Sequence, residues 1–240
     1  MNGFFHIPST IQHSYVSLIV LHLEEALVPV LAGLLLAVPI GLLCVQYDWL
    51  YAPVLWTSTV LYAIPSIAFF VVLIDYTGLS LLTVMIPLCL YSLVVLVPAV
   101  VDGVRSVPEE TNAAASAMGI GVVRRYFQVQ LPIAVPAIMA GLRVAVASSI
   151  SLVSVGALIG NQGAFGNLLT YAQLYGLPRL AVTAVVTIAV LAVVIDALLV
   201  LLQRVLTPWQ PPSGGAAGRS AAATADAGAG AGAGTPEGAS

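Results

Sequence analysis

The sequence predicts an all-α fold, a polytopic bundle of about five helices that cross a membrane. Of its 240 residues, 60% are hydrophobic and 7% are charged, and the mean hydropathy is +1.06. A soluble domain carries about 25% charged residues, so this chain has too few charges to cover a globule in water. A membrane-spanning helix needs about 20 mainly apolar residues, and several runs reach that length. Membrane-spanning strands are about half as long and alternate in character, so the runs predict helices.

The apolar runs form two groups, one on each side of a polar insert. The candidate spans cover residues 26–45, 53–74, 79–101, 133–159 and 180–202. Prolines interrupt several of them, at Pro39, Pro65, Pro87, Pro98 and Pro136. Each removes a backbone hydrogen bond and tends to kink its helix. In lipid such breaks persist where neighbouring helices or a water-filled cavity satisfy the freed carbonyls, so the pattern favours a transporter over a simple anchor.

The two ends of the chain differ from the middle. Within residues 1–25, the stretch from Tyr15 to Glu25 is either an interfacial amphipathic helix or the start of a longer, tilted first span, with Glu24 and Glu25 at its outer lip. The start lacks a positive n-region and a small-residue cleavage site, so we expect no cleaved signal peptide. The membrane domain is expected over residues 26–208. Residues 209–240 are rich in Gly, Ala, Pro and Ser and are expected to be disordered.

Arginine placement predicts the orientation. Three of the seven basic residues, which are all arginine, lie in the insert between the third and fourth spans, and Arg204 and Arg219 follow the fifth. The positive-inside rule therefore places the insert (residues 104–132) and the C-terminus in the cytoplasm of a multi-pass protein. The net charge of -3 leaves no basic face for a nucleic acid, so none is expected as a partner.

No catalytic or metal-binding set emerges from the sequence. The two cysteines, Cys44 and Cys89, sit in apolar runs and lack the spacing of a zinc site. The three histidines all fall in the N-terminal segment without zinc-helix spacing, and no G-x-S-x-G turn is present. We therefore expect a protein that is not an enzyme and that binds no metal.

The polar insert reads as two short helices around a glycine bend. Pro108 suits a first helical turn, and Glu109 and Glu110 favour its positive end. Small residues from Ala113 to Ala117 continue this helix, and Gly119 and Gly121 then bend the chain. A second short helix is expected from Arg124 to Val129, ended by Leu131-Pro132. The alanine face is smooth, so a groove of another protein can approach it closely.

These residues resemble the EAA motif of binding-protein-dependent ABC transporter permeases, whose pattern is E-A-A-x3-G-x9-I-x-L-P. Ala114-Ala115, Gly119, Val129 and Leu131-Pro132 fit it without any adjustment of spacing. The motif's glutamate position is Ala113, and Glu109 and Glu110 lie about one turn upstream, where they can supply a similar charge. Further stretches resemble the glycine betaine/carnitine/choline branch of these permeases: residues 61–68, 103–107, 131–143, 156–160 and 196–206. The resemblance covers roughly residues 18 to 208.

The resemblance implies an ABC type-1 (MetI-like) permease fold in the bacterial inner membrane. It implies cytoplasmic ATPase subunits, an extracytoplasmic solute-binding protein and a second permease subunit, identical or similar, as partners. The insert would dock in grooves on the ATPases, through Glu109, Glu110, Ala114, Ala115, Gly119, Leu131 and Pro132. This chain has no G-x4-G-K-[ST] loop, so ATP would be used by the partner and no cofactor is expected here.

Several residues within the spans are candidates for the pathway. Tyr62, Pro65 and Ser66 lie mid-span, and Gly163, Gly166 and Asn167 are candidates for an outer gate; ordinary packing or an ordinary loop is the alternative for each. Ser148, Ser149, Ser151 and Ser154 give the fourth span a small polar stripe. Arg143 and Asp196 are intramembrane charges, which either pair across the bundle or extend separately toward water.

The predicted function is that of the permease subunit of an ATP-driven importer for a compatible solute such as glycine betaine, choline or carnitine. Two alternatives stay open. One is an ABC permease for another small solute, such as an amino acid. The other is an ion-coupled secondary transporter, which needs intramembrane acids as ion sites, and Asp196 is the plausible one.

Overall fold

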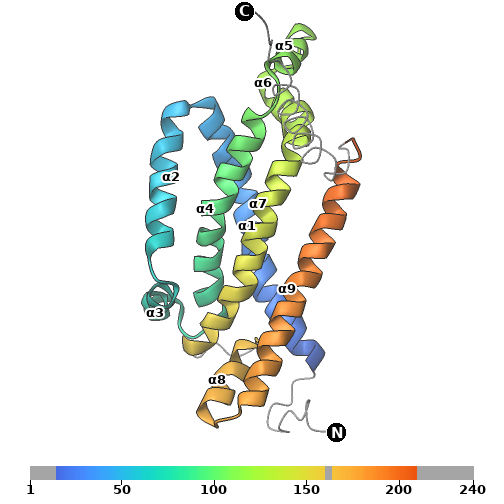
Figure 1. Cartoon of the computed structure of the whole chain (residues 1–240). Helices are drawn as coiled ribbons and strands as arrows, with labels where there is room; N and C mark the ends of the chain where they lie inside the picture. Colours follow the sequence, from blue (N-terminus) through green and yellow to red (C-terminus); the bar gives the residue numbers. More distant parts are fainter. Residues whose placement is uncertain (1–14, 160–163, 210–240) are drawn as a thin grey trace, which may run out of the picture. The chain divides into compact units, whose positions relative to one another are not determined.

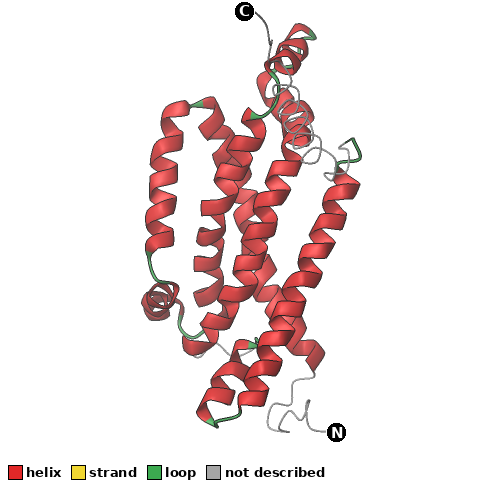
Figure 2. Ribbon diagram, in the orientation of Figure 1, coloured by secondary structure: helices red, strands yellow, loops and turns green. Residues whose placement is uncertain are grey.

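The computed structural model describes residues 15–159 and 164–209, and every regular element among them is helical (Figures 1 and 2). The described residues up to Gln203 form one compact unit, which is the bundle described below. The helices are α1 (Tyr15–Gln46), α2 (Asp48–Ala63), α3 (Ser66–Thr77), α4 (Leu81–Arg105), α5 (Glu109–Ala117), α6 (Val122–Arg125), α7 (Leu131–Gly156), α8 (Gly166–Leu174) and α9 (Pro178–Leu206). A π-helical turn (Tyr126–Gln130) precedes α7, and a 3-10 turn (Ala157–Ile159) follows it.

The predicted spans correspond to four long apolar helices and one bent pair. α1, α4, α9 and the run from Val122 to Ile159 are long and apolar enough to cross a membrane. α2 and α3 together make a fifth candidate, bent by 91° at the break between them. α1 is one continuous helix from Tyr15, so the stretch from Tyr15 to Glu25 begins the first long helix, as the second of the two sequence interpretations has it.

The centre of the bundle is made by α1, α4 and α7, which run side by side in Figure 1 and contact one another pairwise. Small residues allow this close approach. A Cβ on Gly41 of α1 would lie 2.6 Å from Val100 Cγ1 of α4, and one on Gly141 of α7 would lie 2.5 Å from Ala99 Cβ of α4. Backbones of membrane helices come together at such residues because van der Waals packing drives their association.

Gly141→Ala is expected to destabilise the bundle by about 1–3 kcal/mol, because the added methyl has no space against Ala99 and the helices must move apart. The matched control is Gly121→Ala, whose added methyl meets nothing within 4 Å at a φ of -63°, which suits alanine. Thermal unfolding of both variants in detergent measures the difference. Equal melting temperatures would contradict close packing between α4 and α7.

An ion pair joins the start of α2 to the end of α4. Arg105 Nη2 donates to Asp48 Oδ1 at 2.7 Å, and the guanidinium lies 5.1 Å from the ring centroid of Tyr51. The two side chains are 42% and 88% exposed, which places this contact at the rim of the bundle. α5 and α6 lie beyond the same end of α4, and α3 and α8 lie at the opposite end (Figure 1).

Candidate functional site

The polar insert folds as the glycine spacing predicts, up to its second helix. Pro108 precedes α5, and Glu109 and Glu110 form the exposed first turn of that helix. α5 ends in a Schellman motif: Ile120 N–H donates to Ala115 O at 3.1 Å, and Gly119 N–H donates to Ser116 O at 3.0 Å. Gly119 has a φ of +76°, a conformation that disfavours any residue with a Cβ. The bend therefore depends on this glycine.

The second helix of the insert does not end at Leu131-Pro132, which corrects the sequence prediction. α6 passes through the π-helical turn Tyr126–Gln130 directly into α7, where Pro132 occupies the first turn. Proline lacks an N–H and its ring collides with the carbonyl four residues before it in a regular α-helix. The wider π turn directly before Pro132 fits that requirement, so the helix continues. The insert is thus joined to α7 without an intervening loop.

Side-chain bonds hold α5 against the start of this long helix. Gln130 Nε2 donates to Asn112 Oδ1 at 2.7 Å, and Arg125 Nη1 donates to Ser116 Oγ. Both bonds run from the α6–α7 side to α5. The insert is therefore a preformed unit, in which α5 is bonded to the segment that leads into α7.

Apolar side chains project from this unit. Met118, Val122, Val123 and Phe127 are 72%, 49%, 69% and 59% exposed. We call these four residues the apolar patch. Ala114 is also exposed, whereas Ala115 is 2% exposed and packs inward, so the predicted alanine face is only partly available. The sequence reading did not single out the patch, because hydrophobic residues are everywhere in this chain.

The second span breaks where Pro65 stands. α2 ends at Ala63, Ile64 is extended with ψ 125°, and α3 starts at Ser66. The residue before a proline is disfavoured in the α conformation, which accounts for the break. The span expected over residues 53–74 is therefore a bent pair of helices, with the break at the proline that predicts a kink. Tyr62, Pro65 and Ser66 all lie at this break, and Tyr62 is 55% exposed.

The three candidate residues for an outer gate fall in different settings. Gly163 lies outside the described residues. Gly166 is buried at the start of α8, where a Cβ would lie 2.6 Å from both Ala157 Cβ and Ser154 O. Asn167 follows it and donates its N–H to Ala164 O at 3.1 Å. Gly166 thus allows α8 to pack closely against the end of α7.

The intramembrane charges do pair. Arg143 Nε donates to Asp196 Oδ1 at 2.6 Å and Arg143 Nη2 donates to Asp196 Oδ2 at 2.8 Å, a two-bond contact between α7 and α9. Such parallel bonds are the strong form of an arginine–carboxylate contact. The two side chains therefore do not extend separately toward water, which is the alternative expectation.

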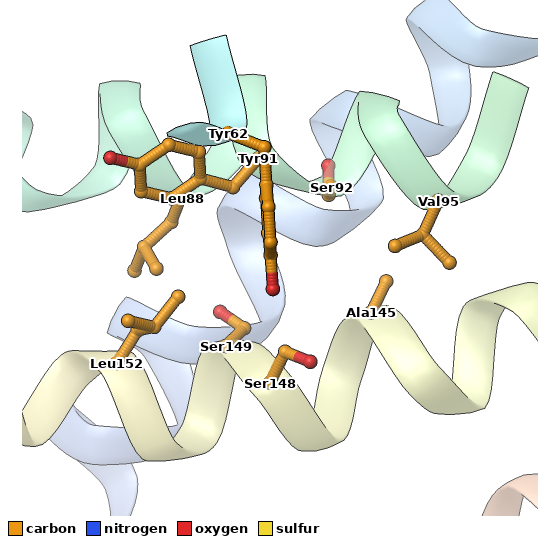
Figure 3. A pocket seen from close by; sticks show the side chains of 9 residues that line it. All are labelled: Tyr62, Leu88, Tyr91, Ser92, Val95, Ala145, Ser148, Ser149 and Leu152. Atoms are coloured by element: carbon orange, nitrogen blue, oxygen red, sulfur yellow. The ribbon is translucent and has the colours of Figure 1, made fainter. Parts of the chain in front are cut away.

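The serine stripe of α7 faces two directions. Ser149 is buried and its hydroxyl donates to Ala26 O of α1 at 2.8 Å. Ser148 lines a small space beside α2 and α4, with Tyr62 and Tyr91 (Figure 3). Ser151 and Ser154 instead line a larger space between α7, α8 and α9, of about 360 Å³. The stripe is thus shared between helix packing and two separate spaces.

Two ionisable residues on α1 have a setting that the sequence did not reveal. His22 and Glu25, one turn apart, are fully buried, whereas Glu24 is exposed. His22 Nε2 lies 3.1 Å from Ile150 O of α7, and its ring meets Phe165 edge-on at 5.7 Å. Glu25 therefore lies on the side of α1 that packs inside the bundle.

Comparison with known proteins decides the family. Residues 30–210 match the family of binding-protein-dependent transport system inner membrane components. This chain belongs to that family. Among curated relatives, the osmoprotectant import permease protein OsmW of Salmonella typhimurium is 34% identical over 192 residues, which are 78% of this chain and 89% of that protein. The choline transport system permease protein OpuBD of Bacillus subtilis is 30% identical over 78% of this chain and 83% of its own length.

The fold is that of a MetI-like permease. A chain of the MetNI methionine ABC transporter, solved in inward-facing conformations, superposes with a TM-score of 0.72 at 18% identity, over 84% of this chain and all of that one. The chain is therefore an integral, multi-pass membrane permease of an ABC importer and not an enzyme. An ATPase and a solute-binding protein are the partners that such a permease requires.

Proposed function

We propose that this chain forms the membrane pathway of an ATP-driven importer for a compatible solute that carries a quaternary ammonium group, such as choline, glycine betaine or carnitine. The names of the two relatives above support the solute class, since one is an osmoprotectant permease and the other a choline permease. An extracytoplasmic binding protein delivers the solute, and a second permease, identical or similar, completes the pathway.

The preformed insert is the observation that carries the coupling part of the proposal. An exposed apolar patch beside charged residues is typical of a protein–protein contact. We assign the patch, with Glu109, Glu110, Ala114 and the Gly119 bend, to the surface that an ATPase groove receives. Ala115, Leu131 and Pro132 act from within, by packing α5 and by continuing the insert into α7. ATP is bound by that partner and not by this chain.

The orientation follows from the same assignment. The end of the bundle that carries α5 and α6 faces the cytoplasm, and the end with α3 and α8 faces the binding protein. Arg105, Arg124 and Arg125 gather at the first of these ends, in accord with the positive-inside rule. Tyr62, Pro65 and Ser66, at the break of the second span, border the pathway, and Asn167 lies near its outer mouth.

Uptake into proteoliposomes tests this proposal. The permease is reconstituted with its ATPase and binding protein, and uptake of radiolabelled choline is measured with ATP, without ATP and under an imposed ion gradient. We expect uptake that requires ATP and is reduced by unlabelled glycine betaine but not by methionine. Competition by methionine alone would indicate an amino acid permease. Uptake driven by the ion gradient without ATP would indicate a secondary transporter.

A further inference from the structure

Three aromatic rings from three helices meet at the break of the second span. The Tyr62 and Tyr91 ring centroids are 5.8 Å apart with an interplanar angle of 78°, and those of Phe69 and Tyr91 are 6.0 Å apart at 67°. Both contacts are edge-to-face. Tyr62 lies in the last turn of α2, Phe69 in the first turn of α3, and Tyr91 in α4. The 91° bend at Pro65 is what brings α2 and α3 rings to the same neighbour.

One ring of this aromatic cluster is buried and hydrogen-bonded, and another is more than half exposed. Tyr91 is 6% exposed, and its hydroxyl donates to Ile64 O at 3.1 Å, an acceptor that the helix break leaves without its regular partner. Tyr62 is 55% exposed. A rotation of the Tyr62 side chain therefore costs little packing, whereas Tyr91 is held in place by its hydrogen bond and by burial.

The walls around the two tyrosines are apolar, with a few hydroxyls. Figure 3 shows Ser148 and Ser149 reaching from α7 on the wall opposite α4. None of the nine residues that line this space carries a charge. The space itself is about 10 Å³, enough for about one water molecule. A larger group enters only when the Tyr62 ring swings away from Tyr91.

The edge-to-face geometry has a direct chemical meaning. The face of an aromatic ring is electronegative and its edge is electropositive, so the edge of one ring now covers the face of the next. A trimethylammonium group spreads its charge over its methyl hydrogens and is attracted to the same ring faces. It also tolerates apolar walls, because it has no hydrogen-bond donor to leave unsatisfied.

We propose that Tyr62, Phe69 and Tyr91 form a transit site for the quaternary ammonium group of the solute, in which the Tyr62 ring swings away from Tyr91 and the group lies between the faces of these two rings. Tyr62 lies about 21 Å along α2 from Asp48, at about 1.5 Å per residue, and so near the end of the bundle away from α5. This inference rests on the proposed function for its solute class and for the direction of transport. It places the site where the solute arrives first after release from the binding protein.

Binding of choline to the permease–ATPase complex in nanodiscs, without the binding protein, tests the site directly. The second ligand is the tert-butyl analogue of choline, in which carbon replaces the ammonium nitrogen. Tyr62→Phe keeps a ring and should bind choline as the wild type does. Tyr62→Leu should bind choline about tenfold more weakly while its binding of the neutral analogue stays within about twofold. Tyr76→Leu, at a tyrosine that is 85% exposed on the same bent span, is the matched control and should change neither.

Fluorinated phenylalanine at position 62 gives a graded version of the same test. Fluorine withdraws charge from the ring face, so choline binding should fall in order from unfluorinated to singly to triply fluorinated rings. The proposal of a transit site would be overturned if Tyr62→Leu lowered the affinities for choline and for its neutral analogue equally, or lowered neither. The proposed function fails separately, if the wild-type transporter takes up no quaternary ammonium solute, because binding to the complex is measured without transport.

Discussion

Phe127→Asp is expected to abolish ATP-driven uptake and to separate the ATPase from the purified permease. Phe127 is 59% exposed on the insert, and Val123, one turn before it, is 69% exposed. In the proposed complex these side chains enter an apolar groove, where a carboxylate has no partner and must lose its water. Disruption of a contact at the centre of an interface costs about 2 kcal/mol or more of binding free energy. The affinity between permease and ATPase should therefore fall by about thirtyfold or more.

The controls separate a docking defect from misfolding. Phe127→Leu retains an apolar side chain at the same place and should keep most uptake and ATPase association. Val123→Asp should reproduce the defect of Phe127→Asp, because both residues belong to the apolar patch. Copurification of the ATPase on a tagged permease is the measurement, with thermal unfolding as a check on the bundle. A Phe127→Asp variant that still copurifies with its ATPase would show that the patch is not the docking surface.

Breaking the Arg143–Asp196 pair is expected to have the second large effect. Either Arg143→Gln or Asp196→Asn leaves one charge between α7 and α9 within the membrane, where an unpaired charge is costly. Only Thr183 and Ala184 of α9 are buried among the described residues, so α9 has little packing to replace the lost bonds. We expect uptake to fall to background in both single variants, with less protein in the monodisperse peak on size exclusion.

Two double variants test whether the pair itself is responsible. The exchange Arg143→Asp with Asp196→Arg restores opposite charges and should recover part of the folded protein. The neutral double variant Arg143→Gln with Asp196→Asn removes both charges and should be folded better than either single variant, because no charge is left without a partner. If the single variants retained normal uptake and elution, the pair would have no role in holding α9.

Much of the helix content follows from local properties of the sequence. Runs of apolar residues such as 79–101 are too long for strands and carry too little charge for water, so each can only be a helix in lipid. Gly119 and Pro65 likewise act locally, one by permitting a positive φ and the other by disfavouring the α conformation of Ile64. Family motifs in the insert, read by their spacing, led to the family that comparison then showed.

The relations among distant residues followed from packing alone. Nothing in the sequence near Arg143 or Asp196 tells a paired charge from one that extends toward water; the crossing of α7 and α9 brings them within 2.6 Å, though they stand 53 positions apart. The sequence also does not tell which apolar residues are exposed. Ala115 packs inward while Ala114 is exposed, and Phe127 projects outward in a chain where apolar residues are the norm.

Composition and spacing determined that this protein is a helical membrane permease, because those constraints act within single segments. Which charges pair, which rings meet and which apolar residues stay free for a partner was decided by the tertiary structure, because each depends on the angle and rotation at which two helices pack.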